Sequence, residues 1–242
     1  AARLRTLPLA SACVLTGAGL AAATGVPSDR LYLLFGGCLL TVILLQVLAN
    51  FANDLGDFEN GADVQQGQER LDRAVASGRI SASQMRLAVY STGGLAFVCG
   101  LITVILAVGQ DWLELAQWVL IGVVALGGAY AYTAGKKPYG YSGLGDVSVL
   151  LFFGFAGVAG TAVLLSGQFD PRWLFPAAAI GLFSVAVLNL NNLRDHVSDA
   201  ATGKHTLVVR MGFDTAKRYH AALLIGGWIA LVAFWQVDPE GP

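Results

Sequence analysis

Charged residues are scarce in this 242-residue chain: they make up 13% of it, whereas 55% of its residues are apolar. Soluble domains carry about 25% charged residues. The shortage excludes a soluble domain and indicates a membrane protein. Histidine and cysteine are also rare, with three of each. The histidines are isolated, and Cys13, Cys38 and Cys99 lie in apolar runs at irregular spacing, so neither residue type predicts a metal site.

Seven apolar runs are long enough to cross the ~30 Å hydrocarbon core of a bilayer, which takes about 20 residues. Strands of a membrane barrel alternate apolar and polar residues, whereas these runs are apolar all round, so helices are expected. All the intervening segments are short. We therefore predict an all-α, polytopic transmembrane bundle that forms one domain over residues 1–242. Its spans are expected at 7–24, 31–50, 85–108, 112–132, 146–166, 173–190 and 219–237.

The positive charges are distributed unevenly between the two sets of loops. Of the 15 Lys and Arg residues, only Arg30 and Arg172 lie in loops that connect an odd-numbered span to the next, even-numbered span. Lys and Arg favour cytoplasmic loops, so the other set is predicted to face the cytoplasm of a bacterial inner membrane. No nucleic-acid partner is expected, and the sequence leaves the oligomeric state open.

Two apolar runs end in similar acidic motifs. Asn50–Asp63 follows the second run, Asn189–Asp199 follows the sixth, and Asn53–Asp57 aligns with Asn191–Asp195. Helical spacing would place Asn50, Asn53, Asp54 and Asp57 on neighbouring faces. A solvated polar loop could explain one such cluster, but its repetition favours a duplicated site for a cation and a diphosphate. Mg²⁺ suits this chemistry because it binds through one or two carboxylates plus substrate phosphates.

Several cationic and aromatic side chains accompany the motifs. Lys and Arg could hold diphosphate oxygens, although each could also be an ordinary cytoplasmic anchor. Tyr130–Asp146 contains four Tyr and two Lys, which suits either a substrate site or an aromatic belt at the membrane interface. Asp146 is either a helix cap or functional. The candidates for substrate contact are Arg5, Arg70, Arg73, Lys136, Lys204, Arg210, Tyr132 and Tyr139.

The motifs resemble those of the UbiA-type intramembrane aromatic prenyltransferases over nearly the whole chain. The resemblance rests on N-D-x-x-D-x-x-x-G-x-D from Asn53, on the Tyr–Lys loop, and on N-N-L-R-D-x-x-x-D-x-x-x-G-K-x-T-L-V-V-R-x-G from Asn191. It implies polyprenyl diphosphate and aromatic acid substrates, a lipid bilayer, and Mg²⁺ held by Asp54, Asp57, Asp195 and Asp199. Lys136 and Tyr132 would be catalytic. Lys204, Arg210, Asp63, Asn50, Asn53, Asn191 and Asn192 would help to hold the substrates.

Within this family, the second motif and the Tyr132–Asp146 stretch are most similar to members that prenylate 1,4-dihydroxy-2-naphthoate in menaquinone synthesis. The implied reaction releases CO2 and pyrophosphate and gives demethylmenaquinone. The family has nine spans, so the resemblance implies that the last two are missing from residues 1–242. Another departure is E-R-L-D-R-A-V-A-S-G, which lacks an expected Gly-Pro between its arginines and weakens the assignment of Arg70 and Arg73.

Three alternatives stay open at this point. The acceptor could be 4-hydroxybenzoate or homogentisate. A transporter would also have an internal repeat, but its polar site would lie near the bilayer midplane, whereas the acidic residues here lie at the ends of spans. A lipid-binding scaffold would account for neither the repeated carboxylates nor the cations beside them.

Overall fold

The protein is a bundle of helices in a computed structural model that describes residues 2–60, 74–134 and 138–238; no strand occurs among these residues. This confirms the predicted all-α fold. The long elements are α1 (Leu7–Ala22), α2 (Ser28–Glu59), α3 (Ala82–Val108), α4 (Trp112–Ala131), α7 (Leu174–Ala201) and α9 (Phe213–Val237). A further long helix is made of three consecutive segments, α5 (Gly145–Val149), η4 (Leu150–Gly160) and α6 (Thr161–Ser166). Short pieces connect them: η1 (Leu4–Thr6), η3 (Tyr139–Ser142), η5 (Pro171–Trp173) and α8 (Leu207–Met211).

Six of the seven expected spans are helices long and apolar enough to cross a membrane. The exception is the first: α1 has 16 residues, which at about 1.5 Å per residue falls short of a full bilayer core. Both motif-bearing helices extend past the predicted spans: α2 continues to Glu59, inside the first acidic motif, and α7 continues through the second motif to Ala201. Residues 50–59 and 189–199 therefore have fixed helical positions.

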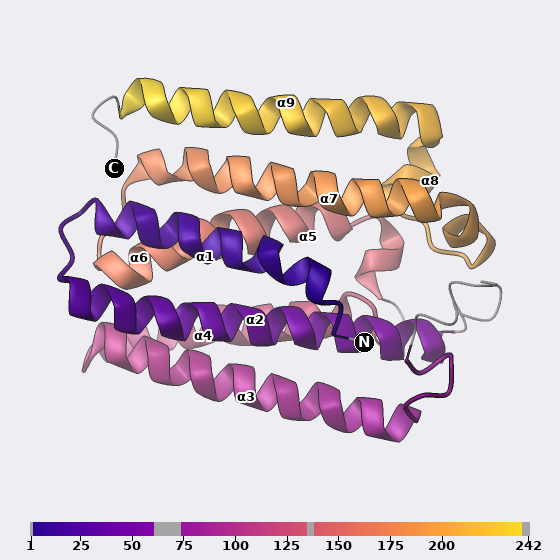
Figure 1. Cartoon of the computed structure of the whole chain (residues 1–242), viewed down its shortest axis with the longest axis horizontal. Coiled ribbons are helices and arrows are strands. Elements are labelled where there is room, and N and C mark those ends of the chain that lie inside the picture. Colours follow the sequence, from indigo (N-terminus) through magenta and orange to yellow (C-terminus); the bar gives the residue numbers. More distant parts are fainter. Residues whose placement is uncertain (1, 61–73, 135–137, 239–242) are drawn as a thin grey trace.

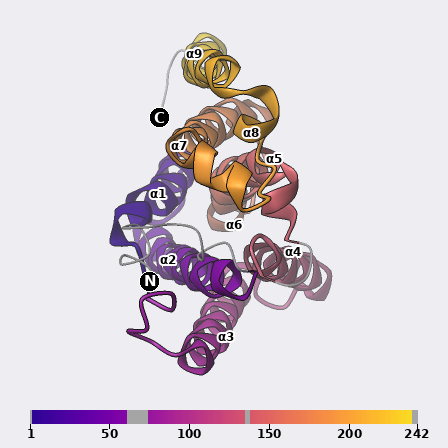
Figure 2. The ribbon, with the colours of Figure 1, turned by 90° about the vertical axis from the view of Figure 1, so that its right-hand side faces the viewer.

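The helices run roughly side by side, so their connections gather at two opposite ends (Figure 1). One end carries the start of α1, the ends of α2, α4 and α7, and the starts of α3, α5 and α9. Both acidic motifs lie at this end, as the alternation of spans predicted. Viewed along the bundle, α3 and α9 lie at opposite edges, with α9 packed against α7 (Figure 2).

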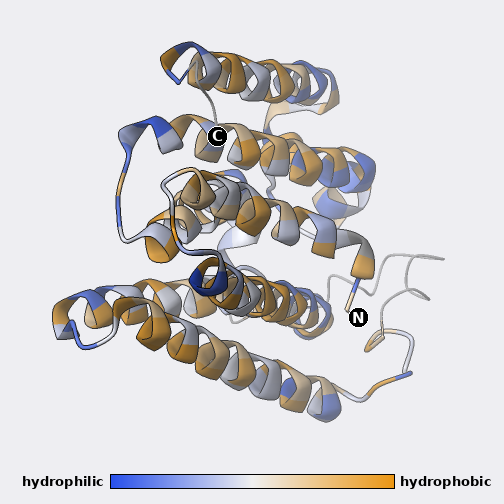
Figure 3. Ribbon diagram, turned by 60° about the vertical axis from the view of Figure 1, so that its left-hand side comes forward, coloured by the Kyte–Doolittle hydropathy of each residue, from blue (hydrophilic) through white to orange (hydrophobic). Residues whose placement is uncertain are grey.

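The helices consist mostly of apolar residues along their length, and polar residues are more frequent at their ends (Figure 3). Exposed large side chains include Leu95, Ile102, Ile225 and Ile229. Apolar surface of this extent suits contact with lipid rather than water. Together with the six long helices, it identifies a multi-pass membrane protein.

Small residues let the central helices approach closely. The backbone of η4 is wound as a π-helix and packs against α7, where an added Cβ at Gly154 would lie 2.5 Å from the carbonyl oxygen of Ala177. Any larger residue at position 154 would push the two helices apart. Close packing of this kind, through small residues, is typical of helices in membranes. It leaves other side chains of η4 pointing to the opposite side, into a central cavity.

Candidate active site

A cavity of about 510 Å³ lies inside the bundle, with walls from α1, α2, α3, α4, η4 and α7. Its charged lining residues come from the motif-bearing end: Arg3, Asp57, Arg194, Asp195, Asp199 and Lys204. Toward the other end the described lining is uncharged and mostly apolar. The cavity can therefore hold an amphiphile with an anionic head and a hydrocarbon tail.

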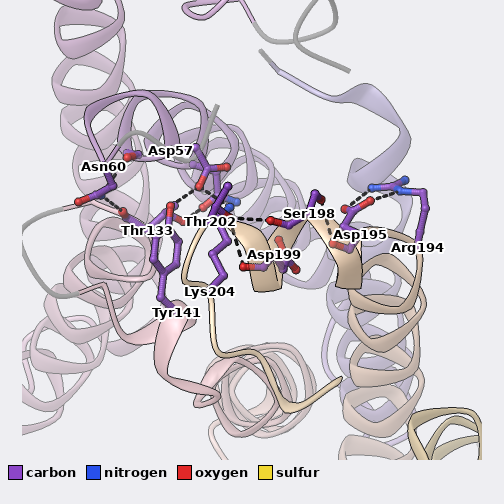
Figure 4. A network of polar contacts seen from close by, with 12 residues as sticks. Asp57, Asn60, Thr133, Tyr141, Arg194, Asp195, Ser198, Asp199, Thr202 and Lys204 are labelled. Atoms are coloured by element: carbon purple, nitrogen blue, oxygen red, sulfur yellow. Dashed lines mark hydrogen bonds and ion pairs between the residues drawn. The ribbon is translucent and has the colours of Figure 1, made fainter. Parts of the chain in front are cut away.

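An ion pair between the first acidic motif and the loop that follows the second lies at the polar end (Figure 4). The Nζ atom of Lys204 is 2.7 Å from Oδ1 of Asp57, and both side chains are buried. The hydroxyl of Tyr141 donates to the same Asp57 oxygen, and its ring lies 4.8 Å from the Lys204 ammonium. Burying charges is costly unless they are paired and hydrogen-bonded, so this arrangement holds a carboxylate and a cation together in a low-dielectric site.

The loop that follows α7 positions Lys204. Its backbone N–H donates to the carbonyl oxygen of Asp199 at 2.8 Å, which folds the loop back toward α2. Asp199 is buried and lines the cavity. Asp195, one turn earlier, also lines the cavity but forms a two-point ion pair with the neighbouring Arg194, at 2.6 and 2.7 Å. Asn191 and Asn192 complete the α7 wall.

The first motif presents one face of α2 to the cavity. Asn50, Asn53 and Asp57, spaced by three and four residues, line it. Asn50 donates to the carbonyl oxygen of Ala2 at 2.8 Å, and Asn53 accepts from the Thr133 hydroxyl. Asp54 is buried and is not among the residues that line the cavity.

The Oδ2 atom of Asp54 accepts the backbone N–H of Ala74 at 3.1 Å, while its Oδ1 atom is buried and has no hydrogen-bond partner among the described residues. Around the helix, Asp54 is about 100° from Asn53 but only about 60° from Asp57, so it lies at the edge of the face that lines the cavity.

Tyrosines from the loop after α4 form another wall. Tyr132 and Tyr139 line the cavity and pack edge to face, with ring centroids 5.4 Å apart. The Tyr139 hydroxyl bonds to the carbonyl oxygen of Gly128 and to Ser148. A Cβ at Gly145 would lie 2.9 Å from the Tyr132 hydroxyl, so a larger residue there would have to displace the Tyr132 ring. Burial, with a further contribution from the Asp146 carboxylate, raises the pKa of Tyr132, so its phenol stays neutral at physiological pH.

The remaining predicted residues lie elsewhere or outside the described chain. Arg210 is exposed and is not among the cavity residues; its Nε atom donates to the carbonyl oxygen of His205 at 3.0 Å. Asp63, Arg70, Arg73 and Lys136 lie outside the described residues, as does the side chain of Arg5.

The described residues alone do not form a metal cage: no group of three His, Cys, Asp or Glu among them could hold an ion. The oxygen donors at the polar end still suit Mg²⁺, because Asp57 and Asp199 are buried carboxylates beside the amides of Asn53, Asn191 and Asn192. Mg²⁺ commonly takes one or two carboxylates and completes its shell with phosphates and water. The residues thus fit an ion that arrives together with a diphosphate.

Sequence reasoning missed three contributors to this site. Arg3 lines the cavity, Thr133 bonds Asn53, and Tyr141 contacts both partners of the buried ion pair. The loop's four tyrosines were a visible signal, but their spacing did not distinguish Tyr141 from Tyr132 and Tyr139. Thr133 carried no signal of its own.

Fold and site together define a class: a helical membrane protein with carboxylates and a buried lysine at the mouth of an apolar cavity. The family model of the UbiA prenyltransferase family matches residues 10–239. The chain belongs to this family and is a prenyltransferase by descent.

Bacterial relatives resemble the chain over nearly its whole length. It is 42% identical over 233 residues to the 1,4-dihydroxy-2-naphthoate octaprenyltransferase of Haemophilus influenzae. The matched region covers 96% of this chain and 75% of that protein. The Escherichia coli protein of the same name is 41% identical, over 96% of this chain and 74% of its own. The mouse UbiA prenyltransferase domain-containing protein 1 is 30% identical, over 78% of this chain and 53% of its own length.

Proposed function

We propose that the protein transfers a polyprenyl group from polyprenyl diphosphate to 1,4-dihydroxy-2-naphthoate, with loss of CO2 and pyrophosphate, to give the hydroquinone form of demethylmenaquinone. The observation that carries the proposal is the buried Asp57–Lys204 pair at the polar end of an apolar cavity, in a chain 42% identical to a relative named for this reaction. A diphosphate head and a hydrocarbon tail match the two ends of that cavity.

The chain's own residues bind and polarise the donor. Lys204 balances the charge of Asp57 and lies within reach of a diphosphate placed beside that carboxylate. Its ammonium can stabilise the charge that develops on the leaving oxygens as the allylic C–O bond breaks. Mg²⁺, held through Asp57 and Asp199, would supply further neutralisation of the leaving group.

The walls next to the polar end protect the reacting carbons. Phe152, Tyr132 and Tyr139 line the cavity there and turn aromatic surface toward it. Aromatic faces stabilise a nearby carbocation, and apolar walls exclude water that would capture it. The neutral Tyr132 phenol can donate a hydrogen bond to the acid or hydroxyl groups of the acceptor. The acceptor ring then bonds to the prenyl carbon, and the ring regains its aromaticity as its bond to the carboxylate breaks and CO2 leaves.

Offering three acceptors together tests the choice of substrate. With dihydroxynaphthoate, 4-hydroxybenzoate and homogentisate present at equal concentration, mass spectrometry should find mainly the prenylated naphthoate product that has lost CO2. EDTA should abolish turnover, and excess Mg²⁺ should restore it. The proposal is wrong if prenylated hydroxybenzoate that retains its carboxylate predominates, or if turnover persists in EDTA.

We infer that the motif-bearing end faces the cytoplasm, because 13 of the 15 Lys and Arg residues belong to segments at that end of the predicted topology. Cysteines introduced at the exposed positions Ser142 and Ala201 should react with an impermeant maleimide only from the cytoplasmic side. One introduced at Ser28, at the opposite end, should react only from outside. Labelling of Ser142 and Ala201 from different sides would disprove this orientation.

A further inference from the structure

The far end of the cavity is closed by a defined set of side chains. Val104 and Leu164 line the cavity and also belong to a buried cluster with Ala21, Leu34 and Leu165. Cys38 and Trp118 line it as well and pack against the same cluster. A hydrocarbon tail that enters from the polar end meets this cluster and cannot continue straight along the bundle.

Trp118 is the largest of the side chains at this floor, and it bridges two helices. It lies on α4, and the edge of its six-membered ring faces Gly160 at the end of η4: the Cζ3 and Cη2 atoms are 3.7 and 3.9 Å from where a Cβ of Gly160 would be. Its indole N–H points back to Glu114 on the preceding turn, at 3.4 Å. The ring therefore crosses the space between α4 and η4, which Figure 2 shows beside each other.

The distance from this ring to the polar end limits the tail. Tyr132 follows Trp118 by fourteen residues along α4, which corresponds to about 21 Å of helix. A few isoprene units fit this depth, whereas a long polyprenyl chain in extended form does not. The units beyond that depth have to bend aside where they meet Trp118.

We propose that Trp118 is the residue that determines how strongly this protein prefers one prenyl chain length over another, an inference that rests on the proposed prenyl transfer. Removing the indole would open space directly below the cavity, and filling Gly160 would raise the floor. A Cβ at Gly160 meets no atom closer than 3.7 Å, so the backbone there accepts a side chain that then extends toward Trp118. The two changes act in opposite directions on the same volume.

The test compares donors of different length on matched variants. The ratio of kcat/KM for octaprenyl diphosphate to that for geranyl diphosphate should rise about 10-fold or more in Trp118→Ala, because a hydrophobic pocket discriminates by about that factor for each methylene it gains or loses. The ratio should fall in Gly160→Leu. Trp112→Ala is the control, since Trp112 lies on the same helix but is 78% exposed, and its ratio should stay at the wild-type value. Trp118→Leu replaces the Ala variant if the latter does not fold.

A binding measurement separates this inference from the proposed reaction. Non-hydrolysable geranyl and octaprenyl thiodiphosphates should each raise the melting temperature of the wild type. In Trp118→Ala, the rise caused by the octaprenyl analogue should increase relative to the rise caused by the geranyl analogue. If no acceptor is ever prenylated but this shift occurs, the proposed reaction fails and the role of Trp118 stands. If a folded Trp118 variant keeps the wild-type length preference in both measurements, Trp118 does not set it.

Discussion

Replacing Asp57 by Asn should lower prenyl transfer at least ~100-fold, a loss of about 2.7 kcal/mol of transition-state stabilisation. The carboxylate is buried, lines the cavity and bonds both Lys204 and Tyr141. A neutral amide cannot pair with the lysine or share a cation with the diphosphate. Asp199→Asn should cause a loss of similar size, because this second carboxylate lines the same polar end from α7. Initial rates of pyrophosphate release measure both.

The double variant shows whether the two carboxylates act as one unit. Groups that serve a single step are non-additive, so Asp57→Asn with Asp199→Asn should be scarcely slower than the slower single variant. Asp214→Asn controls for loss of charge, since Asp214 lies at the start of α9, at the same end of the bundle, with an exposed side chain. Losses that add in folded variants would mean that the two motifs form separate sites.

Lys204→Met should lower both stability and activity, for different reasons. Losing the lysine removes the cation 2.7 Å from a buried carboxylate, and breaking one partner of a buried pair costs about 3–5 kcal/mol. The variant should therefore melt at a lower temperature. Turnover should also fall roughly 100-fold, because the diphosphate loses a cation that contacts its oxygens.

Adding Asp57→Asn to Lys204→Met separates these effects. The double variant removes both charges of the pair, so its melting temperature should return toward the wild-type value while its activity stays absent. The exposed pair of Lys217 and Asp214, 2.8 Å apart, supplies the control. Lys217→Met should change stability little, since exposed ion pairs contribute about 0–1 kcal/mol. Recovery of activity in the double variant would show that the pair is only structural.

The sequence predicted the helical bundle well because span length and apolar composition decide it locally. Six of the predicted spans correspond to long helices. The remaining one, the first, is also an apolar helix but is shorter than predicted. The motifs also lie at one end, as the alternation of spans required. What single-sequence reasoning could not predict was how far α2 and α7 continue beyond the apolar runs, since helix propensity in polar segments is weak evidence.

The detailed site depended on contacts between distant segments. Lys204 and Asp57 are 147 residues apart in the sequence, and nothing local to either predicts their pairing. Helical spacing grouped Asn53, Asp54 and Asp57, yet Asp54 bonds the backbone of Ala74 instead of facing the cavity. The π-helical winding of Leu150–Gly160, which positions Phe152 and Gly160, had no signal in composition. Which side chains pair, and which of them face the cavity, is decided only when the helices pack into the bundle.

The most direct test is an experimental structure of the protein with Mg²⁺ and a non-hydrolysable polyprenyl thiodiphosphate. We expect the diphosphate to lie between the Asp57–Lys204 pair and Asp199, with its tail directed toward Trp118. A diphosphate that contacts only one motif, or that binds at the opposite end of the bundle, would contradict the single shared site.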